Sequence, residues 1–323
     1  MKRYRLENEH LIVEFLALGG TIIKIEKKKN HTNYVLAYHS MQDYYENPYY
    51  MGSLIGRVAG RVYPPYYQDA LLIRRELEQN ENQCCLHGGS EGFYRRIWQV
   101  ELISTTLARL SLEDDSNIYG KARFVVDYRL DKNQFIIEIK GESGEPTLMN
   151  MTSHLYFNLN QNKEDSVENH YLQINSQAIQ KVDSHCIPLN ETIEKTSLDA
   201  NYYFLTPKKV KAAFEQATDL VQWCHNGIDL AYCFEQDQPL LEPLVVVWSD
   251  DGTNGLQIRT DQECCVVYTL NKITERYTLT TNIPIYKYGG ITFEMQRRPN
   301  YVHLDSKSSL QKMYGQTTIY EIL

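Results

Sequence analysis

Long hydrophobic runs and a surplus of basic residues are both missing from this sequence of 323 residues. The strongly apolar stretch at residues 244–248 is far shorter than the ~20 residues of a membrane-spanning helix. The first residues, MKRYRLENEHLIVEF, contain no apolar run long enough for a secretory signal. The formal net charge is −8, whereas nucleic acids and anionic membranes attract clustered Lys and Arg. We therefore expect a cytoplasmic protein whose partner is a small molecule, not a nucleic acid or a membrane.

Paired cysteine motifs are also missing. The chain has seven cysteines, but no CxxC spacing occurs, which argues against a zinc ribbon and a thioredoxin-like motif. The number is odd, and two pairs are adjacent in sequence. The cysteines are Cys84, Cys85, Cys186, Cys224, Cys233, Cys264 and Cys265. We expect reduced thiols that pack as small apolar side chains in a reducing compartment.

Several common catalytic motifs are missing as well. There is no HExxH and no GxSxG, which argues against zinc proteases and serine hydrolases. The segment GSLIGRVAGRV is rich in glycine, but no GK[ST] follows it, so it is not a phosphate loop. The histidines and carboxylates that remain lack Cys–His metal spacing and resemble an acid–base set. We expect a site without a metal or a cofactor.

The sequence does contain many short segments in which apolar and polar residues alternate. In QFIIEIKGE, Phe135, Ile137 and Ile139 share one face. Comparable runs begin at residues 10, 123, 171, 243 and 256. Helical patterns are sparse, with residues 208–220 as the best candidate and one or two turns near residue 41. The pattern predicts an all-β sandwich or barrel that forms a single domain over residues 1–323.

Two glycine-containing segments could bring polar groups close to a ligand. GSLIGRVAGRV contains Arg57 and Arg61, and its glycines allow close backbone approach. Taken alone, such an arginine is more often part of a structural ion pair than a ligand contact. The segment LHGG places His87 before two glycines, on a turn that we expect to be exposed. A turn histidine without a function explains this segment equally well.

Three further segments place ionisable groups inside apolar strands. In NMTSHLYFNLN, alternation puts His154 on a polar face and leaves an apolar face opposite. In GGITFEMQRRPN, Glu294 shares a face with Thr292 and Gln296, which makes it a candidate general base. In NGIDLAYCF, Asp229 lies among apolar residues, where a carboxylate needs a partner or a ligand.

Taken in order, these segments resemble the aldose 1-epimerase (galactose mutarotase) family. The family pattern has a GRvAnR-like run, an LHGG, an NLTNHSYFNL-like strand, a GxDxxY-like turn and an LExQxxP-like strand. This sequence has GRVAGR, LHGG, NMTSHLYFNL, GIDLAYCF and FEMQRRP in the same order, between about residues 52 and 300. LHGG alone is a weak signal, but the ordered set is specific.

The resemblance implies a large antiparallel β-sandwich, the galactose mutarotase-like supersandwich, with an open sugar-binding cleft. It implies an aldose 1-epimerase that interconverts the α- and β-anomers of a free aldose of the galactose or glucose type. Glu294 would be the base and His154 the acid, while Arg61, His87 and Asp229 would bind the substrate. No cofactor is implied, the partner is a monosaccharide, and the protein would be a monomer or a homodimer.

This sequence departs from the family pattern next to the expected catalytic residues. Gly60 replaces an asparagine before the arginine, and Ser153 and Leu155 replace an asparagine and a serine around the acid histidine. Leu230 stands where a histidine commonly follows the aspartate, and Val266 stands at what resembles a glutamine position. These departures concern the preferred sugar more than the reaction.

The proposed acid–base reaction requires defined protonation states of His154 and Glu294. We expect a neighbouring carboxylate to hold His154 cationic and Glu294 to stay ionised, with a bell-shaped pH profile that is flat near neutrality. Other functions remain open: a non-catalytic sugar-binding protein, and a glycoside hydrolase that uses Asp229 and Glu294. A phosphorylated or otherwise modified sugar is a further alternative. Five arginines could bind its anion, although such residues are more often solvated surface charges: Arg57, Arg95, Arg96, Arg297 and Arg298.

Overall fold

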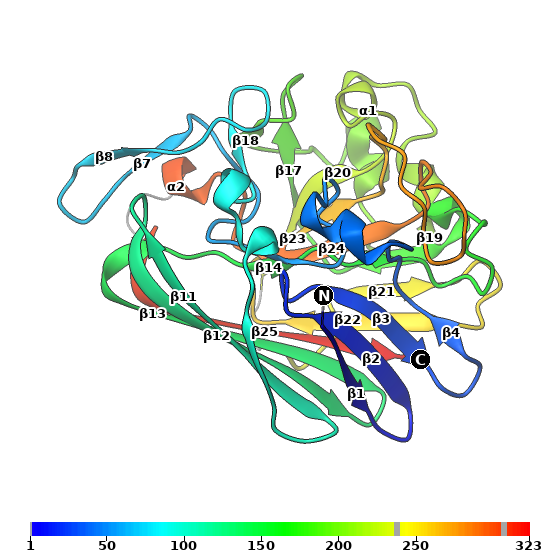
Figure 1. Ribbon diagram of the computed structural model, residues 1–323. Helices are drawn as coiled ribbons and strands as arrows, with labels where there is room; N and C mark the ends of the chain where they lie inside the picture. The colour runs from blue at the N-terminus through cyan, green and yellow to red at the C-terminus, as the bar shows by residue number, and fades with distance from the viewer. Residues whose placement is uncertain (1, 236–239, 305–308) are drawn as a thin grey trace.

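The computed structural model describes residues 2–235, 240–304 and 309–323, and the chain there is folded mainly as antiparallel strands (Figure 1). A nine-stranded sheet has the order β10 (Gln99–Leu102), β11 (Leu107–Ser116), β12 (Gly120–Asp131), β13 (Gln134–Leu148), β25 (Leu310–Ile322), β22 (Gly255–Thr260), β21 (Val245–Trp248), β16 (Tyr171–Ile174) and β19 (Lys208–Lys209). A six-stranded sheet has the order β15 (Tyr156–Phe157), β24 (Ile291–Gln296), β23 (Cys264–Tyr268), β20 (Asp229–Cys233), β17 (Ala178–Val182) and β18 (Pro188–Thr192).

Smaller sheets and short helices complete the described fold. A four-stranded sheet has the order β1 (Arg3–Glu7), β2 (Leu11–Leu16), β3 (Ile22–Lys27) and β4 (Thr32–Asn33). Three strand pairs join β14 (Thr152–Ser153) to β5 (Leu54–Ile55), β6 (Arg61–Val62) to β9 (Cys85–Leu86) and β7 (Tyr66–Gln68) to β8 (Arg74–Glu76). The helices are α1 (Asp219–Trp223), α2 (Tyr301–Leu304) and the 3-10 turns Met41–Tyr45, Gly89–Glu91, Phe93–Arg95, Val167–Asn169, Leu198–Tyr202 and Val210–Ala213. None of the helices in the described ranges is long and apolar enough to cross a bilayer.

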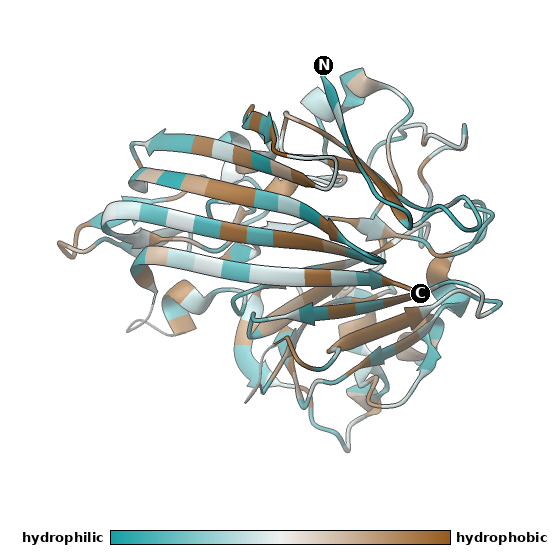
Figure 2. Ribbon diagram, turned by 90° about the horizontal axis from the view of Figure 1, so that it is seen from below, coloured by the Kyte–Doolittle hydropathy of each residue, from teal (hydrophilic) through white to brown (hydrophobic). Residues whose placement is uncertain are grey.

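The two large sheets pack together through one apolar core, as the predicted sandwich requires. Phe157 of the six-stranded sheet lies 5.5 Å, between ring centroids, from Tyr320 of the nine-stranded sheet. Along β13, Phe135, Ile137 and Ile139 point into this core, as the alternation predicts. Figure 2 shows the resulting bands of apolar and polar residues along the long strands. The prediction of an all-β fold of large antiparallel sheets is confirmed.

The predicted helix at residues 208–220 is wrong as a continuous element. Lys208 pairs with Leu172 at the edge of the nine-stranded sheet, and a single 3-10 turn follows over Val210–Ala213. An α-helix begins only after Thr218, whose hydroxyl accepts a hydrogen bond from the backbone N–H of Val221. Edge-strand pairing has overridden the local helix propensity. The turn predicted near residue 41 is present as Met41–Tyr45.

Two of the strand-like runs contain two strands each, and the two strands belong to different sheets. The run from residue 256 supplies β22 to the nine-stranded sheet and then β23 to the six-stranded sheet. The run from residue 171 supplies β16 and then β17 in the same way. In each run the chain passes from one large sheet to the other, and strands of both sheets contribute residues to the same core. Periodicity alone does not mark such a crossing.

Candidate functional site

The six-stranded sheet has one face in the core and one face in a cleft. Antiparallel register places Glu294 of β24 opposite Val266 of β23, and Val266 opposite Ala231 of β20. Ala231 in turn lies opposite Gln180 of β17. Directly paired residues point to the same side of a sheet, and these four side chains line the same cavity. The alternate residues on the same strands, such as Phe293, belong to the core.

His154 reaches this cleft from a point where the chain passes between sheets. It lies between β14 and β15, not within a continuous strand. Its N–H donates to Ser53 O at 2.9 Å, and its carbonyl accepts from Gly52 N at 2.9 Å. These two bonds fix the backbone, so the imidazole projects into the cleft. Leu155 points the other way into the core, as the alternation predicts.

His87 is buried, with only 6% of its surface exposed, so the expectation of an exposed turn is wrong. Its backbone is left-handed at φ 55° and is followed by Gly88 at φ 81°. A side chain at position 88 would place its Cβ 2.4 Å from Gly56 O, so the turn packs tightly against the chain around residue 56. The LHGG turn therefore folds inward and carries the imidazole to the cleft.

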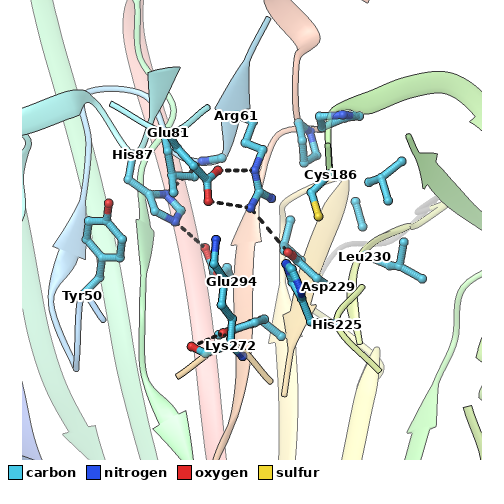
Figure 3. Close-up of a pocket in the computed structure, with 18 of the residues that line it drawn as sticks. Tyr50, Arg61, Glu81, His87, Cys186, His225, Asp229, Leu230, Lys272 and Glu294 are labelled. Carbon is cyan, nitrogen blue, oxygen red and sulfur yellow. Dashed lines mark hydrogen bonds and ion pairs between the residues drawn. The ribbon is translucent and has the colours of Figure 1, made fainter. Parts of the chain in front are cut away.

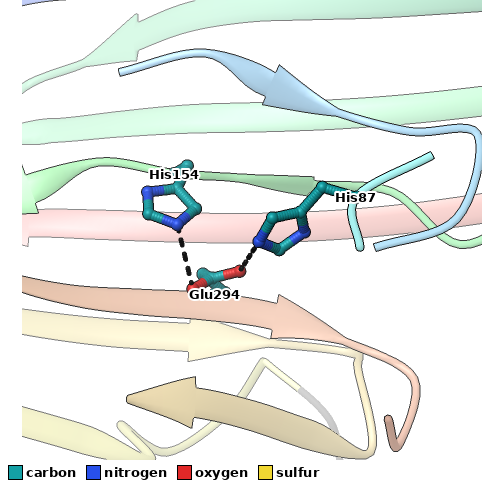
Figure 4. A group of neighbouring side chains, drawn as sticks. All are labelled: His87, His154 and Glu294. Atoms are coloured by element: carbon teal, nitrogen blue, oxygen red, sulfur yellow. Dashed lines mark ion pairs between the residues drawn. The ribbon is translucent and has the colours of Figure 1, made fainter. Parts of the chain in front are cut away.

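Glu294 lies between the two imidazoles (Figure 4). Its Oε1 is 3.4 Å from His154 Nε2, and its Oε2 is 3.9 Å from His87 Nε2. Thr292, two residues earlier on the same face, donates its hydroxyl to Glu294 Oε1 at 3.3 Å. Glu294 Oε2 and His154 Nδ1 have no hydrogen-bond partner, although both atoms are buried. Such groups are costly unless a ligand satisfies them.

Burial controls the protonation of this pair. It raises the pKa of Glu294 from 4.5 to about 8, with a smaller contribution from the charge of Asp229. It lowers the pKa of His154 to about 3. At neutral pH these shifts favour a protonated Glu294 carboxyl group and a neutral His154 imidazole. The expectations of a cationic His154 and an ionised Glu294 are therefore wrong, because desolvation favours the neutral form of each group.

The tautomer of His87 follows from its backbone contact. The N–H of Gly60 donates to His87 Nδ1 at 3.2 Å, so the proton of the neutral ring lies on Nε2. Burial, helped by the charges of His154 and Arg61, lowers the pKa of His87 well below its usual value and keeps the ring neutral. His87 consequently presents an N–H donor toward Glu294 and toward any ligand beside it.

Arg61 joins a second cluster of charged side chains in the same cleft (Figure 3). Its Nε lies 2.6 Å from Glu81 Oε2, and its Nη2 lies 3.5 Å from Asp229 Oδ2. Burial raises the pKa of Asp229, and the positive charge of Arg61 opposes that rise. The guanidinium thus holds two carboxylates in fixed positions, and all three groups can accept from or donate to sugar hydroxyls.

The two clusters line one cavity of about 500 Å³. The structure therefore brings Glu294, His154, Arg61, His87 and Asp229 together, although they are spread over the sequence. The arginines considered for an anion lie elsewhere: Arg57, Arg95, Arg96, Arg297 and Arg298 are not among the residues that line this cavity. The buried Arg57 instead pairs with Asp114 at 2.7 Å. The cavity therefore does not use these arginines to bind a phosphorylated sugar.

His87, His154 and Glu294 also have the composition of a metal site. Their potential ligand atoms lie within 4.8 Å of one another. A metal ion would need a lone pair on His87 Nε2, however, and the hydrogen bond from Gly60 to Nδ1 places a proton on that nitrogen. The donor set therefore fits proton transfer better than metal coordination.

Two residues of the site were missed by the sequence reasoning. Glu81 holds Arg61 in a bidentate contact, but it lies in the polar stretch EQNENQ, which looks like any surface loop. Tyr50 packs against both imidazoles, with ring centroids 4.7 Å from His87 and 5.6 Å from His154. It is one of 25 tyrosines, and nothing in its neighbourhood distinguishes it.

The departures from the family pattern separate into two groups. Gly60 and Val266 line the cavity, and Leu230 borders it although it also belongs to the apolar core. Ser153 instead hydrogen-bonds Tyr320 at 2.9 Å, and Leu155 packs in the core. Only the first group can alter contacts to a ligand.

Comparisons with known proteins identify the family of this chain. The sequence model of the aldose 1-epimerase family matches residues 2–312. An aldose 1-epimerase of Haemophilus influenzae is 30% identical over 322 residues, which cover 96% of this chain and 91% of the relative. A galactose mutarotase of Sus scrofa is 24% identical over 311 residues, covering 94% and 87%.

Solved structures share the fold. An aldose epimerase homologue from C. elegans superposes with a TM-score of 0.88 at 20% identity, covering 100% of this chain and 98% of that chain. A galactose 1-epimerase from Lactobacillus acidophilus gives a TM-score of 0.83 at 24% identity, covering 99% and 93%. The match of the family model over nearly the whole length, together with the Haemophilus relative, identifies the family. The chain belongs to the aldose 1-epimerase family.

Proposed function

We propose that the protein interconverts the α- and β-anomers of a free aldose, with Glu294 and His154 as the acid–base pair. The observation that carries the proposal is the buried pair itself, with Glu294 Oε1 3.4 Å from His154 Nε2 and unpartnered atoms beside a cavity. A pyranose in the cavity would supply the missing partners through O1–H and the ring oxygen. Galactose and glucose are the aldoses proposed.

The reaction needs two coupled proton transfers. Glu294 takes the proton of the O1 hydroxyl while His154 gives its proton to the ring oxygen, and the C1–O5 bond breaks. The aldehyde then rotates about the C1–C2 bond and presents its other face to the C5 hydroxyl. The same transfers in reverse close the ring with the opposite configuration. Each positioned transfer typically contributes about 10²- to 10⁴-fold to the rate.

The pKa directions favour ring opening. Before opening, Glu294 is a carboxylate and His154 an imidazolium, a pair of charges that burial disfavours. After opening, Glu294 is protonated and His154 is neutral, which is the state that burial prefers. Hydrogen bonds from the cyclic sugar to both charges stabilise the ion pair beforehand. Burial therefore lowers the free energy of the open-chain complex relative to that of the cyclic one.

The other site residues position the sugar. His87 would donate its Nε2 proton to O1 or a neighbouring hydroxyl, because its tautomer is fixed by Gly60. Asp229 would accept from a hydroxyl, and Arg61 would donate, while Glu81 holds the guanidinium in place. Asp229 is thus engaged as a partner of Arg61, which does not favour its use by a glycoside hydrolase.

Domain organisation, cellular location and oligomeric state complete the proposal. One apolar cluster contains residues from Leu6 to Ile322, so we propose that residues 1–323 fold as a single domain. A cytoplasmic location and a monomeric or dimeric state stay predictions. Fractionation and light scattering would test them.

Polarimetry of freshly dissolved α-D-galactose and α-D-glucose tests the activity. The protein should accelerate mutarotation, and Glu294→Gln should lower kcat by at least 10²-fold. His154→Asn should lower kcat while calorimetry still detects sugar binding. Ser153→Ala is the matched control, because Ser153 neighbours His154 but faces Tyr320. Full activity of Glu294→Gln would refute the acid–base pair, and binding without turnover by the unmodified protein would favour a non-catalytic sugar-binding role.

A further inference from the structure

A pair of cysteines lies on the cleft face of the six-stranded sheet, beyond the row that contains Glu294. Cys233 is the last residue of β20 and Cys264 the first of β23, and the two are direct partners in the ladder. Positions 231 and 233 share a face, as do 266 and 264, because side chains alternate.

The local ladder gives this pair a specific geometry. The N–H of Phe234 donates to Glu263 O at 2.8 Å, so the next pair along, Cys233 and Cys264, is a non-hydrogen-bonded pair. Such pairs have Cα atoms about 4.5 Å apart, which is within the range that disulfides span, about 4.4–6.8 Å. A disulfide can therefore form here without a change of strand register.

The two sulfurs differ in environment. Cys233 is partly exposed, whereas Cys264 is fully buried. The hydrogen bond from Cys264 and the positive charge of Arg298 lower the pKa of Cys233, although burial and Glu263 oppose the shift. Thiolate character and exposure together make a cysteine reactive toward oxidants. Cys233 is thus suited to react with an oxidant, and Cys264 is placed to attack the oxidised sulfur of Cys233 and form a disulfide.

The other cysteines lack this arrangement. Cys264 and Cys265 are adjacent in β23, where successive side chains point to opposite faces. Cys84 lies outside β9 and bridges to Glu81, while Cys85 pairs with Val62. The thiol of Cys186 donates to Trp223 O, and the thiol of Cys224 lies 3.9 Å from Asp229 O. Among the cysteines, only Cys233 and Cys264 are ladder partners.

We propose that Cys233 and Cys264 form an oxidation site that hydrogen peroxide converts to a cross-strand disulfide. The Cys233 thiolate attacks one peroxide oxygen, the O–O bond breaks, and a first water leaves. Cys264 then attacks the Cys233 sulfenic acid, the S–S bond forms, and the S–O bond breaks to release a second water. The sulfurs lose two electrons in total, the peroxide gains them, and both thiol protons end in water. This site is independent of the proposed sugar reaction.

Intact mass spectrometry of the full-length protein after treatment with hydrogen peroxide tests the site. The protein should lose the mass of two hydrogen atoms, and alkylation under denaturing conditions should then label five cysteines, which is seven minus two. Peptide mapping should identify a crosslink between the peptides of residues 233 and 264. The thermal midpoint should rise by about 5 °C, because the crosslink restricts the unfolded chain.

Two variants make the result specific. Cys233→Ser should abolish the mass loss, the crosslink and the thermal shift, while Cys186→Ser, which removes a cysteine outside the pair, should keep all three. Oxygen addition without hydrogen loss, a crosslink through any other cysteine, or no reaction with peroxide would overturn the proposal.

Discussion

Strands β13 and β24 differ in which residues of each strand are buried. β13 alternates, with Phe135, Ile137 and Ile139 in the core and Lys140 exposed to solvent. β24 is buried over its whole length, yet one of its faces is polar and contains Glu294. A buried polar face is unfavourable for stability unless it has partners. The apolar face of β13 thus stabilises the fold, whereas the polar face of β24 that lines the cleft supplies the groups for the proposed reaction.

A polar residue in a strand indicates a functional site only where its side chain is buried. On the outer face of β13, Lys140 is exposed to solvent and Glu138 forms a surface ion pair with Arg129. A carboxylate on a strand whose other residues are all buried implies a cavity and a ligand. Substitutions in the core face of β13 should therefore lower the free energy of unfolding. Substitutions in the polar face of β24 should lower activity without lowering stability.

The largest effect on folding is expected for Phe135→Ala. Phe135 is fully buried and packs against Tyr128, with ring centroids 5.6 Å apart. Removing the ring should lower the free energy of unfolding by about 3–5 kcal/mol. The activity per folded molecule should stay unchanged, as polarimetry on material of known folded fraction would reveal. A change in stability below 1 kcal/mol, roughly the cost of a surface substitution, would contradict the assignment of this face to the core.

The second prediction is that Glu294→Gln stabilises the protein at alkaline pH. The raised pKa of Glu294 means that the folded state binds more protons than the unfolded state between about pH 4.5 and about 8. The stability of the unmodified protein should fall as the pH rises through this window, and the glutamine variant should lack that fall. The difference should reach the order of a few kcal/mol at pH 8.5.

Thermal unfolding at pH 5 and at pH 8.5 measures this difference. The gain in thermal midpoint from Glu294→Gln should be larger at the higher pH. Glu138→Gln is the matched control, because Glu138 lies on the solvent-facing side of β13 and should show no such trend. An equal gain at both pH values would mean that burial does not raise the pKa of Glu294.

The third prediction, with the next largest expected effect, is a fall in kcat/KM at alkaline pH. The active pair holds one proton, which is lost as the pH rises through the pKa of Glu294 at about 8. The acid limb should lie far lower, because the pKa of His154 is about 3. We therefore expect kcat/KM to be flat through neutrality and to fall about tenfold for each further pH unit above the limb. A limb near pH 6.5 would instead assign the titration to an ordinary histidine.

The sequence predicted the site better than its chemistry. The order of short motifs identified Glu294, His154, Arg61, His87 and Asp229, and all of them line the cavity. Their ionisation could not be predicted, because a pKa depends on burial, which the ladder creates between strands distant in sequence. The predicted helix at residues 208–220 failed for a similar reason, since pairing with β16 lies outside local propensity.

The smallest effect separates the hydrogen bond of Thr292 from the burial of Glu294. Thr292 donates to Glu294 Oε1 at 3.3 Å, and this bond lowers the pKa of the carboxyl group against the larger rise from burial. Thr292→Val keeps the shape of the side chain and removes the donor. The alkaline limb should then move to higher pH, by less than about one unit, because one neutral hydrogen bond contributes about 1 kcal/mol. Polarimetric rates from pH 7 to 10 measure the shift, and a limb that moves to lower pH would show that Thr292 stabilises the protonated carboxyl group instead.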